Sequence, residues 1–255
     1  MKPFLCFALL LSIGSIAQGS TLYLSRDSNP NGLYVLDTLT GNAALSGLGT
    51  TLVSNSTVGL AMSDTPGVLF GSKANGLLRI NEDGSGATLT GSLAVEALEY
   101  TGGVLYGALN SNFFTINTAT GALDTILASP GADVEGLAFG NDVIYGLVGA
   151  GTGQGNLLAY DIALNSWSLI GNSGIAFDNV GLAYNPYLNI LYATGNQNGN
   201  LYQLDPATGL ATLIGPTGFT SAGGGLAFDP VPEPATTGLI GLGLLGLAGL
   251  RRRMR

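Results

Sequence analysis

The sequence predicts an all-β fold, a β-propeller of five four-stranded blades, on the strength of three observations. Strand-like segments recur about every 40 residues, each repeat holds four kinds of segment, and the two ends of the array complement each other. A β-solenoid and a β-sandwich are the alternatives for many short strands. A solenoid needs shorter and more uniform coils, and a sandwich does not explain complementary ends.

The clearest repeated segment begins with Gly or Asn and ends with Asp or Asn. Its copies are Gly32–Asp37, Gly76–Asn81, Asn112–Asn117, Asn156–Asp161 and Asn200–Asp205. Successive copies start 36 or 44 residues apart. Their length and their content of Leu, Ile, Tyr and Phe are typical of strands.

A shorter strand precedes each of these segments. Its copies are Leu22–Leu24, Leu69–Gly71, Leu105–Gly107, Ile144–Gly146 and Leu191–Ala193. A turn follows each segment and is clearest in residues 39–41, 119–121 and 207–209. In such a turn the preceding Asp or Asn accepts backbone hydrogen bonds, and the glycine takes a positive φ. A further strand then follows, as at Leu169-Ile170 or Leu213-Ile214.

The fourth kind of segment contains small residues, which favour the innermost strand of a blade, where strands crowd around the axis. Its copies are Gly59–Met62, Ala97–Tyr100, Gly136–Phe139, Gly181–Tyr184 and Gly225–Phe228. The last copy has no strand after it, whereas Leu22–Leu24 has no such segment before it. The two halves complete one blade if the chain closes into a ring, which removes the open sheet edge.

Composition excludes several classes of chemistry. The 255-residue chain has no histidine and one cysteine, so Ser-His-Asp or Cys-His catalysis and histidine-ligated metals are excluded. The net charge of −8 argues against nucleic acid as a partner. Outside the two ends only Arg26, Lys73 and Arg79 are basic, whereas all sixteen acidic residues lie between Asp27 and Glu233.

Residues 1–19 have the pattern of a secretory signal peptide. Lys2 precedes the apolar run Phe4–Ile13, and small residues follow it. Cleavage by signal peptidase fits after Ala17 or after Gly19. The propeller is then expected to span residues 20–230.

Residues 231–255 have a different three-part pattern. Pro232-Glu233-Pro234 precedes the apolar run Gly238–Leu250, and Arg251, Arg252, Arg253 and Arg255 follow that run. As a helix the run is about 20 Å long, which is short of the roughly 30 Å hydrocarbon core of a membrane. The arginines favour the cytoplasmic side, which places the rest of the chain outside.

This pattern resembles the PEP-CTERM sorting signal of Gram-negative bacteria. The resemblance implies export through the inner membrane and recognition by an exosortase, with cleavage near Pro232, Glu233 and Pro234. It also implies a location in the cell envelope, on the surface or outside the cell, often in bacteria that make exopolysaccharide. A retained membrane anchor is the alternative, and it does not explain why Pro-Glu-Pro stands directly before the apolar run.

The mouth of the central channel is the expected place for a ligand. The row of residues that starts the inner strands is Val58, Glu96, Glu135, Val180 and Gly224. Two neighbouring blades thus supply Glu96 and Glu135, while Asp133 and Asn179 precede inner strands in their loops. These side chains have the chemistry to bind a hard cation such as Ca²⁺, or a sugar hydroxyl. Glu99 stands in a row that otherwise holds alanine.

Two functions fit these observations. The first is an exported, non-enzymatic propeller, a matrix or ligand-binding module without a cofactor, among extracellular polysaccharide or matrix proteins. The second is a secreted hydrolase of saccharides or lactones that uses the rim carboxylates for acid–base chemistry. A hydrolase would need a third inner-strand carboxylate, which Val58, Val180 and Gly224 do not supply. The only tryptophan, Trp167, falls on an outer strand. We therefore expect a protein that is not an enzyme.

Overall fold

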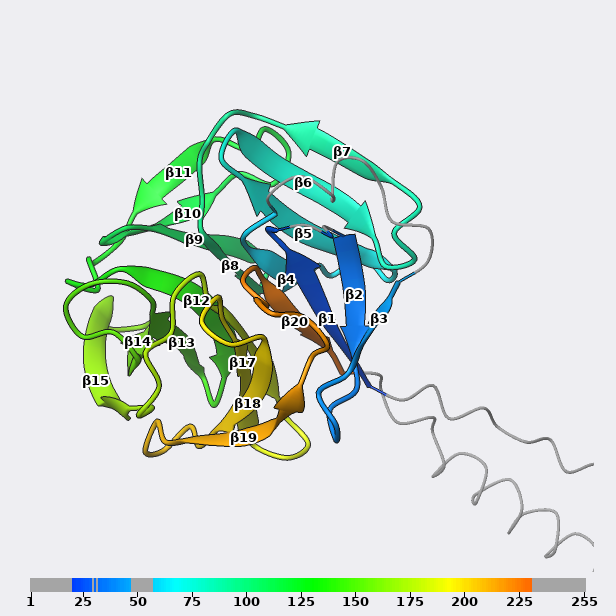
Figure 1. The fold of residues 1–255 in the computed structure, drawn as a ribbon. Helices are drawn as coiled ribbons and strands as arrows, with labels where there is room; N and C mark the ends of the chain where they lie inside the picture. Colours follow the sequence, from blue (N-terminus) through cyan, green and yellow to red (C-terminus); the bar gives the residue numbers. More distant parts are fainter. Residues whose placement is uncertain (1–19, 29, 31, 47–56, 231–255) are drawn as a thin grey trace, which may run out of the picture. The chain divides into compact units, whose positions relative to one another are not determined.

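The computed structural model describes residues 20–28, 30, 32–46 and 57–230. These residues form twenty strands in five antiparallel sheets of four strands each. Figure 1 shows the sheets as blades around a central axis. No helix occurs in the described ranges, and hence none there is long and apolar enough to cross a membrane.

Each blade contains an inner strand, two middle strands and an outer strand, in that order. The inner strands are β4 (Leu60–Met62), β8 (Ala97–Thr101), β12 (Val134–Gly140), β16 (Gly181–Asn185) and β20 (Leu226–Asp229). The second strands are β1 (Thr21–Arg26), β5 (Val68–Lys73), β9 (Val104–Leu109), β13 (Val143–Val148) and β17 (Ile190–Thr194). The third strands are β2 (Gly32–Leu36), β6 (Gly76–Asn81), β10 (Asn112–Ile116), β14 (Asn156–Asp161) and β18 (Asn200–Leu204). The outer strands are β3 (Ala43–Leu45), β7 (Ala87–Thr90), β11 (Leu123–Ile126), β15 (Ser166–Asn172) and β19 (Ala211–Pro216).

The inner strands form a closed ring. Each one contacts the next, β4 with β8, β8 with β12, β12 with β16, β16 with β20, and β20 with β4. Their glycines are needed because the backbones are close: a Cβ on Gly181 would lie 2.6 Å from the carbonyl oxygen of Gly224. The predicted five-bladed propeller is confirmed, and a solenoid and a sandwich are excluded for the described residues.

The ring closes where β1 pairs with β20. In this antiparallel pair Leu22 lies opposite Phe228 and Leu24 lies opposite Leu226. The Ser25 N–H also donates to the Gly225 carbonyl oxygen at 2.9 Å. One blade therefore combines β1, β2 and β3 with a strand from about 200 residues later, as the complementary repeats predict.

Arg26 reinforces this closure from inside the protein. Its side chain is only 2% exposed and lies over the Phe219 ring, 3.9 Å from the centroid. The guanidinium donates to the carbonyl oxygens of Pro30 at 2.6 Å and Ser221 at 2.9 Å. One buried cation thus connects the segment after β1 with the loop before β20.

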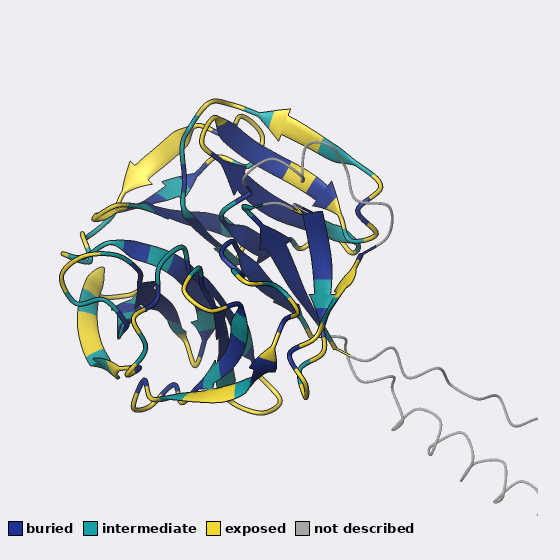
Figure 2. Ribbon diagram, viewed as in Figure 1, coloured by how far each residue is buried: buried dark blue, intermediate teal, exposed yellow. Residues whose placement is uncertain are grey.

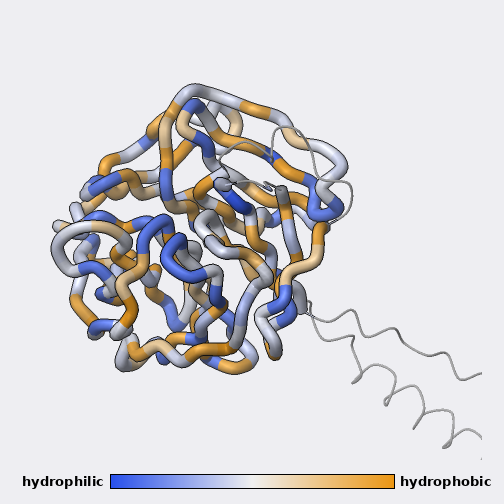
Figure 3. The backbone as a smooth tube through the Cα atoms, in the orientation of Figure 1, coloured by the Kyte–Doolittle hydropathy of each residue, from blue (hydrophilic) through white to orange (hydrophobic). Residues whose placement is uncertain are grey.

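Apolar cores lie between neighbouring blades. Tyr192 of β17, for example, packs with Leu22, Leu24 and Phe228 of the next blade. Figure 2 shows the inner and middle strands largely buried and much of the outer strands exposed. In Figure 3 apolar segments recur along the strands, with polar residues interspersed. The large residues of the middle strands fill the spaces between neighbouring sheets.

The Thr-Gly turns have the predicted geometry and a second role. Asp37 Oδ1 accepts a hydrogen bond from the Leu39 N–H at 2.8 Å. The turn glycines Gly41, Gly121 and Gly209 have φ values of 84°, 66° and 77°. These turns also pack against the outer strand of the preceding blade. A Cβ on Gly171 of β15 would overlap the carbonyl oxygen of Thr208, because the two backbones are in contact there.

We expect Gly171→Ala to lower the free energy of unfolding by about 1–3 kcal/mol, since the added methyl group must push the Thr208 turn away. Gly171 does not have a positive φ, so the effect would come from packing alone. Gly86→Ala is the matched control, because a Cβ there meets only the side chain of Asn81. Denaturant unfolding measures both variants. Equal stability of the two variants would contradict this packing role.

Candidate functional site

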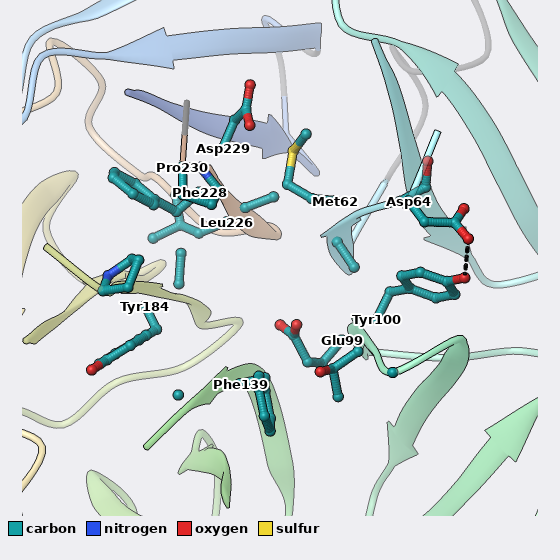
Figure 4. A pocket seen from close by; sticks show the side chains of 18 of the residues that line it. Met62, Asp64, Glu99, Tyr100, Phe139, Tyr184, Leu226, Phe228, Asp229 and Pro230 are labelled. Atoms are coloured by element: carbon teal, nitrogen blue, oxygen red, sulfur yellow. Dashed lines mark hydrogen bonds between the residues drawn. The ribbon is translucent and has the colours of Figure 1, made fainter. Parts of the chain in front are cut away.

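A cavity of about 780 Å³ opens where the five inner strands end. All five blades contribute to its wall, through the last residues of the inner strands and the turns that follow them. Figure 4 shows these side chains arranged around one central space. The cavity lies on the axis of the ring of inner strands.

One large side chain per blade forms the apolar part of this wall. The five residues are Met62, Tyr100, Phe139, Tyr184 and Phe228. Each occupies the fourth position of its copy of the small-residue segment, so the repeat itself places them at the same depth. Aromatic rings supply a large contact area at little entropic cost, which suits a binding wall.

Glu99 on β8 is the unusual side chain of the cavity. Its row otherwise holds the alanines Ala61, Ala138, Ala183 and Ala227, each buried between two blades. In Figure 4 its carboxyl group points toward the middle of the cavity. Replacing one alanine of the ring by glutamate therefore brings a single acid to the cavity floor.

The environment of Glu99 favours its protonated form. Burial raises the pKa of the Glu99 carboxyl to about 8, although hydrogen bonding with the backbone of Phe139 and Tyr100 lowers it. No neighbouring carboxylate within the described ranges contributes to this shift. Glu99 is thus a half-buried acid whose pKa is raised by desolvation and not by pairing with a second carboxylate.

Hydrogen bonds hold two of the tyrosines in position. The Tyr100 hydroxyl donates to Asp64 Oδ2 at 2.9 Å, and this bond is the main cause of a raised pKa of Tyr100. The Tyr184 hydroxyl lies 3.0 Å from Asn141 Oδ1 and 2.9 Å from Asn189 Oδ1. Both rings therefore border the cavity in fixed orientations.

The charge in the cavity wall has one sign. Four carboxyl groups line it, those of Asp64, Glu99, Asp142 and Asp229. No lysine or arginine is among the lining residues that the structure describes. Burial raises the pKa of Asp229, as expected for an acid that lacks a cationic neighbour. Such a wall repels anions and attracts cations.

The predicted rim lies at the opposite end of the inner strands. Glu135 sits in a β-bulge of β12, and its oxygens accept hydrogen bonds from the N–H groups of Ala150 and Asn179. Burial raises the pKa of Glu135 to about 7, and the charge of Asp133 adds to the shift. The two carboxyl oxygens of Glu135 therefore connect the loop at Ala150 with the loop at Asn179.

The structure brings the four predicted rim residues into one neighbourhood. Burial raises the pKa of Glu96, and the charge of Asp133 raises it further. Burial is also the first cause of the raised pKa of Asp133, which borders a hollow of about 340 Å³. The Asn179 side chain donates a hydrogen bond to Asp27. Glu96, Asp133, Glu135 and Asn179 thus share one mouth, as expected from their row.

Metal binding at this rim stays a prediction. Within the described ranges no group of three or more Asp, Glu, His or Cys side chains has the arrangement of a metal site. Glu96 Oε2 accepts a hydrogen bond from the Asn110 N–H at 3.2 Å, so it too has a backbone partner. The geometry does not by itself assemble a calcium site there.

The cavity at the other mouth was missed by reasoning from the sequence. Trp167 lies on the outer strand β15, as predicted, whereas the aromatic residues of the cavity wall are tyrosines and phenylalanines of the inner strands. The signal was available in two rows of the repeat. One holds the large fourth residues, and the other holds Glu99 among alanines.

We expect Glu99→Gln to change how stability depends on pH. The folded-state pKa of about 8 lies above the ordinary value of 4.5, so the folded state holds an extra proton between those pH values. The free energy of unfolding therefore falls as pH rises through this window, and glutamine removes the fall.

The variant should gain about 1–2 kcal/mol over the parent between about pH 5 and about pH 9, measured by denaturant unfolding. Asp124→Asn, at an exposed position on β11, is the control. Parallel pH profiles for the parent and Glu99→Gln would mean that the carboxyl is already solvated.

Several predictions fall on residues that the structure does not describe. These are the signal peptide at 1–19 with Ala17 and Gly19, the C-terminal helix, and the sorting residues Pro232, Glu233, Pro234, Arg251, Arg252 and Arg253. Pro230, the last described residue, lines the cavity mouth.

Comparison with known proteins supports both the fold and the sorting signal. A chain in the crystal structure of a nidogen/laminin complex has a similar fold, with a TM-score of 0.56 and 12% sequence identity. The match covers 83% of this chain and 98% of that chain, and at this identity it shows the fold alone. None of the curated proteins matches the sequence.

The family match lies at the residues that carried the resemblance. Residues 230–253 match the model of the PEP-CTERM protein-sorting motif, PEP_exosort_dom. That motif implies export by way of an exosortase to the cell envelope or surface. The chain is therefore a five-bladed β-propeller that carries a PEP-CTERM protein-sorting motif at residues 230–253.

Proposed function

We propose that this protein is an exported, non-enzymatic binding module whose ligand site is the cavity at the ends of the inner strands. The observation that carries the proposal is the cavity itself, with one large side chain from every blade and Glu99 at its floor. Ligand sites in proteins are mostly pre-formed, apolar hollows with a few placed polar groups, and this cavity has that composition.

The acids of the two mouths support binding better than hydrolysis. Hydrolysis of a glycosidic bond requires two carboxyl groups on either side of that bond, one acid and one base or nucleophile. A second carboxylate placed across a bound sugar from Glu99 would raise the pKa of Glu99 by repulsion. No described carboxylate contributes to the raised pKa of Glu99. At the rim, Glu135 uses both oxygens to accept backbone hydrogen bonds.

A secreted hydrolase of saccharides or lactones is the second candidate. The pKa of about 7 for Glu135 favours it, because a general acid must keep its proton near neutral pH. Glu96 is the acid in the neighbouring blade, and the charge of Asp133 acts on both. We place this candidate second because both glutamates have structural hydrogen bonds.

The place of action follows from the sorting motif. Export by way of an exosortase brings the propeller to the cell envelope or surface. We propose that extracellular polysaccharide or matrix proteins surround it there. Signal peptidase and exosortase act on the chain before that, while the C-terminal helix lies transiently in the inner membrane. The excess of acidic residues favours solubility in that setting and disfavours direct contact with anionic polymers.

The two candidates differ in turnover. We expect the full-length chain, kept in detergent, to release no chromophore from a panel of nitrophenyl glycosides and aryl lactones. Measured rates should equal those of the Glu96→Ala and Glu135→Ala variants, because neither residue is proposed to act on substrate. Turnover by the parent that either substitution abolishes would establish the hydrolase and overturn the binding module.

A further inference from the structure

We infer that the cavity binds an organic cation, an alkylammonium group, between its aromatic wall and the carboxyl group of Glu99. This inference rests on the proposed binding function and adds the chemical class of the ligand. The wall supplies the two features that recognise such a group, which are aromatic rings and negative charge.

Charge decides between classes of ligand. The carboxyl groups of Asp64, Glu99, Asp142 and Asp229 line the cavity, and none of its described lining residues is basic. An anion would meet repulsion with no compensating partner, whereas a cation would replace the missing counter-charge. The field inside a hollow with low-dielectric walls is stronger than the same charges would produce in open water.

The aromatic wall favours an alkylated cation over a metal ion. A cation within about 6 Å of a ring centroid is attracted by the π electrons, more strongly when it is desolvated. Phe139, Tyr184 and Phe228 border the cavity together with Met62, and these apolar groups match the methyl or methylene groups of an alkylammonium. A strongly hydrated metal ion would gain nothing from them.

Glu99 at the cavity floor is not needed for packing of the ring and has no basic partner among the described residues of the cavity lining. Its row in the other four blades holds alanine, so the ring packs well without a carboxyl group there. No basic group lines the cavity beside it, and burial holds its pKa near 8. A cation bound against it would stabilise the carboxylate, lower this pKa and release the proton.

The pH dependence follows from the groups around Glu99. The titratable groups near Glu99 include three tyrosines. Tyr106 of β9 lies opposite Glu99 in the strand pair, and Tyr100 of β8 and Tyr184 of β16 line the same cavity. The acids of the same space are Asp64, Asp142 and Asp229. The charge of Arg79 acts on Tyr100 from outside the lining. Glu99 is therefore the group whose titration near pH 8 should control cation binding.

A neutral saccharide is the competing ligand for such a wall. Aromatic rings also stack on sugars, and Asn141 or the carboxylates would accept hydroxyl hydrogen bonds. A saccharide, however, needs no net negative charge and would not require the Glu99 carboxylate. The two chemistries therefore differ in how binding responds to charge and to pH.

The test uses two probes of the same shape. Choline carries a trimethylammonium group, and 3,3-dimethylbutan-1-ol replaces it with an uncharged tert-butyl group. Calorimetric titration of the full-length chain in detergent at about pH 9 should show saturable binding of choline, about tenfold tighter or more than binding of the alcohol. Choline affinity should fall as pH is lowered from about 9 to about 6, with proton release on binding near neutral pH.

Variants then locate the site. Glu99→Gln should weaken choline binding about tenfold and remove its pH dependence, because the amide neither charges nor titrates. Tyr184→Leu should weaken choline binding while binding of the alcohol changes little, since the apolar surface is kept. Glu135→Gln changes a half-buried acid at the opposite mouth and should leave choline binding unchanged.

Each contrary outcome has a distinct meaning. Equal affinity for choline and the alcohol would overturn the cation inference and leave the binding module standing. No binding of choline, or choline binding that Glu99→Gln does not alter, would also overturn it. Binding of uncharged oligosaccharides that does not depend on Glu99 would show that the ligand is a neutral saccharide and not an organic cation. Only catalytic turnover would remove the proposed function as well.

Discussion

The antiparallel pairing of β1 with β20 is the contact on which the remaining structure depends. It joins residues 21–24 to residues 226–229 and completes a blade that neither end of the array can form alone. It also places Leu226, Phe228 and Asp229 in the cavity wall. Closure therefore completes the cavity, since without β20 the wall would lack the contribution of one blade out of five.

Crowding of the inner strands at the axis is the second constraint. Glu99 is a large residue in a row that otherwise holds alanine, so it departs from this constraint. Every copy of the small-residue segment begins with glycine or alanine. The space there is narrow, since a Cβ on Gly225 would overlap the backbone of β4. A glutamate in an alanine row carries a cost in desolvation, which the raised pKa of its carboxyl records. The same residue gives the cavity floor the charge on which the cation inference rests.

Much of the fold could be predicted from the sequence, because the repeat encodes it directly. Leu22–Leu24 and Gly225–Phe228 are complementary halves of one unit, and the Asp37 turn has a local hydrogen-bond pattern that residue types specify. The sorting motif could also be identified from the sequence, because its three parts stand in order within one short segment.

The site was less predictable, for physical reasons. Both mouths of a propeller are lined by residues of the same strands, and the sequence does not show which end leaves an open space. Glu135 is one of only two acids in its row, yet its oxygens accept hydrogen bonds from backbone N–H groups supplied by loops. The fourth residues of the inner strands resemble ordinary core residues until the ring sets them around a cavity of about 780 Å³.

Native-state hydrogen exchange tests the dependence on closure most directly. The Ser25 amide, which donates to Gly225, should exchange only when the whole propeller unfolds. Its opening free energy and denaturant dependence should then match those of amides in the central strand β13. Faster exchange of Ser25 by a local opening, with β13 still protected, would show that the ring persists without this contact and that the other blades do not depend on it.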